Sequence, residues 1–248
     1  MPVTMLSKLV QKSFRMLGVN LTRLPGNRFD AMSDVLERLA RQGFEPTLII
    51  DAGANKGQWA ATASTAYPHP PLHLIEPQTS CRPALEAFAK RRGQTAVHSV
   101  VVTRPGLQHI AMAGTDSTGA HVVRDTDGRS DLAWLSSTTI DDLLADRLRD
   151  TDRVLLKLDV EGHELDVLAG AVQTLSQVEV IVSEVSFFDA EHSGHTTFLE
   201  YLSALAGYGF ALYDFAALGA RRRDNRLRSG DVVFVRRGTP LIADDRWS

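Results

Sequence analysis

Short apolar runs alternate with helical segments along most of the chain. The runs consist mainly of Val, Ile and Leu and cover residues 48–50, 72–75, 97–103, 154–158 and 178–185. Such runs are typical of strands that are buried on both faces of a parallel sheet. Segments with helical character lie around them, at residues 34–42, 58–63, 83–92, 161–175 and 196–206. The alternation predicts an α/β protein.

The last two apolar runs differ from the others because no helix separates them. Residues 210–215 and 231–235 flank a polar loop, which predicts a hairpin with one strand antiparallel to the sheet. An irregular insert at residues 105–137 interrupts the earlier repeats. This order predicts the Rossmann-like, doubly wound methyltransferase fold, with a seven-stranded, mostly parallel sheet and one antiparallel strand in the C-terminal hairpin.

The expected domain organisation follows from these elements. Residues 1–45 form an N-terminal helical extension, residues 46–240 the methyltransferase domain and residues 241–248 a C-terminal tail. The first 28 residues carry five cations and no acid, with apolar residues at helical spacing. We expect an amphipathic helix that packs on the domain or on a second subunit, and the alternative is peripheral contact with a membrane surface.

Composition limits the remaining classes. The chain has 248 residues, 44% of them hydrophobic, and a formal net charge of −3, which gives no overall argument for nucleic acid as a partner. The single cysteine, Cys81, excludes a disulfide framework and is expected to be a packing residue. Neither a signal peptide nor a membrane-spanning run is evident, so a cytoplasmic enzyme is expected.

A strand, a turn and a helix meet at residues 48–63, where a cofactor site is expected. Asp51 ends the strand, and the turn contains Gly53, Asn55 and Gly57. The turn lacks the GxGxxG pattern of dinucleotide folds, which place a pyrophosphate there. S-adenosylmethionine has no phosphate, and carboxylates can accept hydrogen bonds from its ammonium and ribose hydroxyls.

The acid for the ribose is expected at the end of the second strand. Glu76, followed by Pro77, stands there. Glu76 alone does not discriminate, because NAD folds place an acid at similar spacing. The predicted cofactor is therefore S-adenosylmethionine, bound by Asp51 and Glu76 together with Gly53, Asn55, Gly57 and Pro77.

A second group of polar residues follows the fourth and fifth strands. Asp159, Glu161 and His163 come after one strand, and Glu184 ends the next. One hypothesis makes His163 the general base, against the alternative of a solvated histidine in the first turn of a helix. The other makes Asp159 and Glu184, with Glu161 or Asp189, ligands of a magnesium-type ion. Otherwise Asp159 contacts the cofactor and Glu161 caps a helix.

Further polar residues leave two interpretations open. Lys157 shares a strand face with Asp159 and is expected to form a structural ion pair or to touch substrate. His192 and His195 lie in a loop that is either solvated or part of the acceptor pocket. Trp134 either belongs to the core or stacks on a sugar. The arginine-rich loop at residues 221–228 either is solvated or meets an anionic partner.

Several segments together resemble the FkbM family of S-adenosylmethionine-dependent O-methyltransferases. The most specific is Leu156-Lys-Leu-Asp-Val-Glu-Gly-His-Glu164, and the others are Asp51-Ala-Gly-Ala-Asn-Lys-Gly57, Ile75-Glu-Pro77, Thr139-Ile-Asp-Asp142 and Val167-Leu-Ala-Gly-Ala171. The resemblance covers roughly residues 47–186. It implies methylation of a hydroxyl, usually on a sugar or polyketide-derived glycoside, and the chain resembles actinobacterial sugar methyltransferases.

The expected function is thus a transferase, an O-methyltransferase that acts on a sugar, oligosaccharide or glycolipid. Two alternatives remain: a binding module that keeps the fold without catalysis, and an RNA methyltransferase. Production of S-adenosylhomocysteine would distinguish the first alternative, and salt-sensitive RNA binding would support the second.

Overall fold

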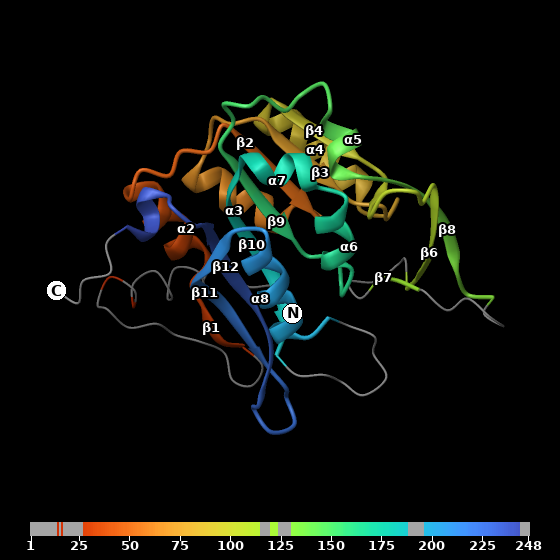
Figure 1. Cartoon of the computed structure of the whole chain (residues 1–248). Coiled ribbons are helices and arrows are strands. Elements are labelled where there is room, and N and C mark those ends of the chain that lie inside the picture. Colours follow the sequence, from red (N-terminus) through yellow and green to blue (C-terminus); the bar gives the residue numbers. More distant parts are fainter. Residues whose placement is uncertain are drawn as a thin grey trace.

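The chain folds around one large twisted sheet in the computed structural model (Figure 1), which describes residues 14, 16, 27–114, 120–123, 130–187 and 196–243. The sheet has eight strands in the order β1-β11-β12-β10-β9-β2-β3-β4. Their bounds are β1 (Asn27–Asp30), β2 (Leu48–Ala52), β3 (Leu72–Ile75), β4 (Thr95–His98), β9 (Val154–Leu158), β10 (Val178–Ser186), β11 (Phe210–Ala220) and β12 (Leu227–Arg236).

The predicted fold is confirmed. Strands β4, β3, β2, β9 and β10 run parallel to one another, and β12 lies antiparallel between β10 and β11. These strands form the seven-stranded sheet with its antiparallel hairpin strand. Strand β1 adds an eighth strand that the sequence did not predict, antiparallel to β11 at the sheet edge.

Helices cover both faces of the sheet. They are α2 (Met32–Arg41), α3 (Gln58–Ala66), α4 (Arg82–Arg92), α5 (Ile140–Leu144), α6 (Glu164–Ala169), α7 (Val172–Gln177) and α8 (Phe198–Gly207), and a short 3₁₀ turn covers Pro240–Ile242. Neighbouring strand residues enter different cores: Ile49 packs with side chains of α2, α3 and α4, whereas Ile50 packs with those of α5 to α8. Alternate side chains of a strand point to opposite faces, so the central strands are apolar throughout.

The N-terminal part joins the sheet directly. Helix α2, predicted at residues 34–42, buries Val35, Leu36 and Leu39 in the same core as Ile49. The amide of Ala31 donates to the carbonyl of Ala216 at 2.8 Å, next to the β1–β11 pair. The proposed amphipathic helix before residue 18 lies almost entirely outside the described residues, and the boundary at residue 45 stays a prediction.

The insert and the short segment before it build a second, four-stranded sheet in the order β5-β8-β6-β7. Its strands are β5 (Val101–Val102), β6 (His109–Ala113), β7 (His121–Val122) and β8 (Ala133–Thr138). A single strand over residues 97–103 is therefore wrong. The carbonyl of His98 accepts a hydrogen bond from the amide of Glu76, directly after β3, and this bond belongs to the large sheet. The amide of Thr103 donates to the carbonyl of Thr138, which belongs to the second sheet.

The expected helix at residues 161–175 is also wrong in extent. Helix α6 begins only at Glu164, because Glu161 has a φ of 52° and Gly162 a φ of 91°, in the left-handed region. A turn at Gly170 and Ala171 then separates α6 from α7. Within the described residues, the structure has no helix that is both long and apolar enough to cross a bilayer.

Candidate active site

A cavity of about 330 Å³ opens at the carboxyl ends of the central strands. Doubly wound folds bind their ligands at this edge of the sheet. The second sheet contributes an apolar wall from β5, β6 and β7, with Val101, Met112 and Val122. Most of the predicted site residues line the cavity, namely Gly53, Asn55, Glu76, Pro77, Asp159, Glu161, His163 and Glu184. Asp51 and Gly57 are not among the lining residues.

The turn after β2 needs its glycine for a reason other than ligand approach. Gly53 has a φ of 83°, and a Cβ atom there would lie 1.8 Å from the Asp159 carbonyl oxygen. Asp159 N also donates to the Ala52 carbonyl at 2.9 Å. Gly53 therefore allows the ends of β2 and β9 to pack against each other. Gly57 also has a positive φ, 82°, at the residue that precedes α3.

Glu76 ties two cavity loops together. Its Oε2 accepts a hydrogen bond from the backbone amide of Asn55 at 2.8 Å, and its Oε1 accepts one from the backbone amide of Gln78 at 2.9 Å. Burial raises the pKa of this carboxyl above its ordinary value, while the two backbone hydrogen bonds oppose the rise. Each carboxylate oxygen can accept a second hydrogen bond. Glu76 can therefore shape the Asn55 turn and still accept hydroxyl groups from the cavity.

Asp51 is a buried acid whose oxygens lack donors. The residue is 1% exposed, and neither Oδ atom has a hydrogen-bond partner among the described residues. Burial raises its pKa to about 7, and the positive charge of Lys157 acts in the opposite direction. A buried carboxylate without donors is unfavourable. It fits a site that a cationic group, such as the ammonium of S-adenosylmethionine, completes.

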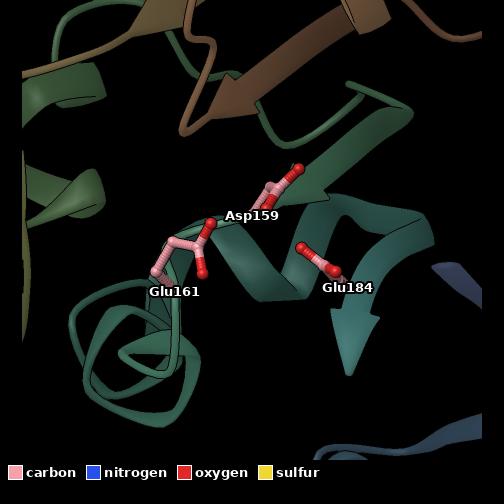
Figure 2. Close-up of side chains that lie close together, drawn as sticks. All are labelled: Asp159, Glu161 and Glu184. Atoms are coloured by element: carbon pink, nitrogen blue, oxygen red, sulfur yellow. The ribbon is translucent and has the colours of Figure 1, made fainter. Parts of the chain in front are cut away.

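Three carboxylates gather at the part of the cavity formed by β9, β10 and the turn after β9 (Figure 2). Asp159 follows β9, Glu161 lies in the next turn, and Glu184 comes from β10. One oxygen of each lies within 4.8 Å of the others. Burial and the charge of Asp159 raise the pKa of Glu184 to about 8, and the same two causes raise that of Glu161. Three acids this close together are therefore unfavourable in their fully ionised form unless a cation compensates them.

A buried lysine lies beside this cluster. Lys157 is 2% exposed, and its Nζ lies 2.6 Å from Asp231 Oδ1 and 3.5 Å from Asp159 Oδ2. Burial alone would lower the lysine pKa, but Asp159 and Asp231 hold it above its ordinary value. The structural ion pair is therefore the interpretation that the geometry supports. The sequence did not identify Asp231 as the partner of this lysine. The one feature that could have indicated it is an acidic residue at the start of the apolar run 231–235.

His163 is not a solvated histidine, because it is 4% exposed. Its Nε2 lies 2.8 Å from Thr103 Oγ1, and its Nδ1 lies 3.2 Å from Asp166 Oδ2. Sequence reasoning did not single out Thr103 or Asp166. Asp166 stands three residues after His163, which is a helical neighbour spacing, whereas Thr103 comes from a distant strand end and left no local signal.

Glu164 holds the turn that presents the acids. Its Oε1 accepts the amides of Gly162 at 3.1 Å and Val160 at 3.3 Å. Glu161 lies between these two amides in a left-handed conformation, so it does not cap a helix. Burial raises the pKa of Glu164 to about 7. The buried carboxylate of Glu164 therefore stabilises the turn from Asp159 to His163 through its backbone amides.

The remaining candidates lie elsewhere. Trp134 is 62% exposed and stands opposite Ala111 in the β6–β8 pair, whereas the neighbouring Met112 lines the cavity. Its side chain therefore points away from the cavity. Cys81 is 3% exposed, as expected for a packing residue. Asp189, His192 and His195 lie outside the described residues. Gln58, Trp59 and Gln78 line the cavity and were not predicted.

The fold and the cavity together define a protein of the Rossmann-like methyltransferase class, with one acid in β2, one directly after β3 and a group of carboxylates at β9 and β10. A family model described as the methyltransferase FkbM domain matches residues 51–212. The chain belongs to this family, as its sequence motifs predict.

Individual relatives are more distant. Hexuronic acid methyltransferase AglP of Haloferax volcanii is 28% identical over 156 residues, which are 61% of this chain and 61% of that protein. The chain thus spans about six-tenths of that relative's length. Among solved structures, magnesium protoporphyrin IX methyltransferase from Synechocystis PCC 6803 has a TM-score of 0.45 and 11% identity, with 92% and 96% of the two chains covered. The 23S rRNA methyltransferase ErmE has a TM-score of 0.45 and 10% identity, with 85% and 70% covered.

Proposed function

We propose that the protein transfers a methyl group from S-adenosylmethionine to a hydroxyl group of a sugar or glycoside. The observation that carries this proposal is the cavity itself. It joins Glu76 and the turn after β2 to the carboxylates Asp159, Glu161 and Glu184. The name of the Haloferax volcanii relative, a hexuronic acid methyltransferase, supports a carbohydrate acceptor.

On the cofactor side, the two buried acids have separate tasks in this proposal. Glu76 accepts the ribose hydroxyls, since each of its oxygens keeps a free lone pair beside the backbone amide that it already accepts. Asp51 compensates the charge of the ammonium group from behind the cavity lining, because its oxygens have no donor among the described residues and are buried. Gly53, Asn55, Gly57 and Pro77 shape the surrounding turns. When bound, the cofactor supplies a methyl group made electrophilic by its sulfonium charge.

On the acceptor side, the carboxylates bind hydroxyl groups and orient one of them for in-line attack. A neutral hydroxyl is a weak nucleophile and must lose its proton during the reaction. Asp159, Glu161 and Glu184 would hold a magnesium-type ion, whose positive charge would orient two vicinal hydroxyls and lower the pKa of one. Three hard oxygen ligands within 4.8 Å suit such an ion.

The general-base hypothesis for His163 stays a prediction. The residue lines the cavity, and both ring nitrogens have partners, Thr103 on one side and Asp166 on the other. Asp166 beside Nδ1 is the arrangement that orients an imidazole and stabilises it when it accepts a proton. In this proposal Nε2 accepts the proton from the acceptor hydroxyl after the Thr103 hydroxyl turns away.

The test is acceptor-dependent formation of S-adenosylhomocysteine by the purified protein, with a panel of saccharides, glycosides and RNA. We expect turnover with at least one saccharide, and loss of turnover in Glu184→Gln while cofactor affinity is retained. Cofactor binding without turnover of any acceptor would indicate a binding module. Turnover of RNA alone would indicate the RNA methyltransferase instead.

A further inference from the structure

The arginine-rich loop lies at the same edge of the sheet as the cavity. Strand β12 runs antiparallel to β10, so the start of β12 flanks the carboxyl end of β10. Ser186, the last residue of β10, pairs with Ser229, and the amide of Phe187 donates to the carbonyl of Arg228 at 2.9 Å. Figure 1 shows the β11–β12 hairpin extending beyond its neighbouring strands. We name residues 221–228 the hairpin tip.

The hairpin tip concentrates positive charge in a chain whose net charge is negative. It contains five arginines and one acid, Asp224, which pairs with Arg221. The side chains of Arg222, Arg223, Arg226 and Arg228 are exposed. Guanidinium groups bind carboxylates and phosphates in a two-point geometry that few other side chains can offer. The tip is therefore suited to an anionic group.

The strand order separates this charge from the cofactor end of the cavity. Glu76 follows β3, whereas the hairpin tip adjoins β10, and β9 and β2 lie between these two strands. Glu184 pairs with Asp231 in the β10–β12 ladder, and Arg228 stands three residues before Asp231 on β12, so Arg228 lies near the strand end that carries Glu184. The arginines thus border the acceptor half of the cavity.

We propose that the hairpin tip binds an acidic group of the acceptor, so that the substrate is a saccharide carrying a carboxylate or a phosphate beside the hydroxyl that is methylated. This inference rests on the proposed function and narrows its substrate class. The arginines of the tip supply positive charge for such a group outside the cavity, apart from the carboxylates of Asp159, Glu161 and Glu184. The hairpin tip therefore also determines the orientation of the acceptor, because its acidic group stays at the tip while the hydroxyl enters the cavity.

The composition of the tip favours a small acidic acceptor over a polymer or a membrane. No aromatic residue stands between Ala216 and Val233, whereas single-stranded nucleic acids are bound by aromatic side chains interleaved with cations. The exposed residues of the tip are polar or charged, and membrane-surface elements pair cations with exposed apolar side chains.

The experiment compares matched neutral and acidic acceptors, such as glucosides with glucuronides and mannosides with their 6-phosphates. The variants are Arg228→Gln and the double change Arg222→Gln with Arg223→Gln. The control is Arg41→Gln with Arg91→Gln, which removes two exposed cations from α2 and α4. Turnover is followed by S-adenosylhomocysteine release, and binding of each sugar to protein saturated with S-adenosylhomocysteine is followed by calorimetry.

We expect the wild type to prefer one acidic series by roughly tenfold or more, through KM rather than kcat, and each tip variant to lose that preference. The variants should keep their cofactor affinity and their rate with neutral acceptors. The glucuronide and phosphate arms identify which acid is recognised. Equal use or equal binding of neutral and acidic sugars by the wild type would overturn the inference.

Other outcomes separate this inference from the function on which it rests. Turnover of neutral saccharides alone keeps the proposed function and overturns the acidic acceptor. If no sugar is turned over, the proposed function fails, and calorimetry still decides whether the tip binds acidic sugars. Binding of the tip to RNA or to vesicles containing phosphatidylserine, with no discrimination between sugars, would overturn the inference in favour of those partners.

Discussion

Lys157 Nζ lies 2.6 Å from Asp231 Oδ1, and this ion pair links β9 to the antiparallel strand β12 on the far side of β10. The lysine is almost completely buried. Its charge is the nearest compensation for Asp159, 3.5 Å away. The pair therefore holds the C-terminal hairpin next to the carboxylates of the cavity.

We predict that Lys157→Met lowers the free energy of unfolding by about 3 kcal/mol, because Asp231 and Asp159 then lack their partner. Urea unfolding followed by circular dichroism measures this change. Adding Asp231→Asn to Lys157→Met should restore part of the loss. Equal stability of Lys157→Met and the wild type would show that the ion pair does not stabilise the fold.

Asp51→Asn should stabilise the cofactor-free protein at high pH and weaken cofactor binding. The folded-state pKa of about 7 is above the ordinary value of 3.8, so the wild type loses stability as the pH rises between these values. The stability advantage of the variant should grow by about 2 kcal/mol between pH 5.5 and 8. Unfolding at several pH values measures it. Asp146→Asn, an exposed change, should show no such trend.

Glu76→Gln should raise the Kd for S-adenosylhomocysteine by roughly tenfold or more. The backbone N–H groups of Asn55 and Gln78 each donate to one carboxylate oxygen of Glu76. A glutamine has only one side-chain oxygen, so one N–H group would face an NH₂ donor and lose its hydrogen bond. Calorimetry gives the Kd. Glu86→Gln on α4, whose carboxylate pairs with Arg82 at the surface, is the matched control and should bind as the wild type does.

His163→Ala should lower the single-turnover rate by about 10²-fold or more if His163 is the general base. Cofactor affinity should change little, since the cofactor residues lie on the other side of the cavity. Rapid-quench measurements with saturating acceptor report the chemical step. His69→Ala, at an exposed position, is the control. A wild-type rate in His163→Ala would exclude the general-base hypothesis.

Removal of divalent ions should abolish methyl transfer if Asp159, Glu161 and Glu184 hold magnesium, and added Mg²⁺ should restore it. The activity of protein treated exhaustively with EDTA provides the measurement. A Glu161→Gln variant should require more Mg²⁺ for half-maximal activity. Full activity after EDTA treatment would assign the carboxylates to direct hydrogen bonds with the acceptor.

The sequence was sufficient for features that depend on local pattern. Buried parallel strands such as β2 and β9 are visible as apolar runs, and the missing helix between β11 and β12 reveals the hairpin. The cofactor acids could be predicted because Asp51 lies near the end of one apolar run and Glu76 directly follows another. The same reasoning located Asp159 and Glu184, since the ends of parallel neighbours meet at one edge.

Features that depend on distant contacts were beyond the sequence. Thr103 reaches His163 across 60 positions and Asp231 reaches Lys157 across 74, and neither pair has a local signal. The run at residues 97–103 has no glycine or proline to mark a break, so its division between two sheets depends on tertiary hydrogen bonds. The sequence predicted a helix that includes Glu161, but Glu161 has a left-handed φ. This conformation depends on Glu164, whose Oε1 accepts hydrogen bonds from the amides of Val160 and Gly162, and the sequence does not reveal that contact.

The contact between Gly53 and Asp159 joins the cofactor turn to the acceptor wall by backbone alone. A Cβ at Gly53 would meet the Asp159 carbonyl oxygen, and the Asp159 amide is bound to Ala52. A substitution that shifts the turn to change cofactor affinity therefore also displaces the carboxylate that faces the acceptor. In an engineered variant, a change in cofactor preference and a change in acceptor preference should therefore appear together.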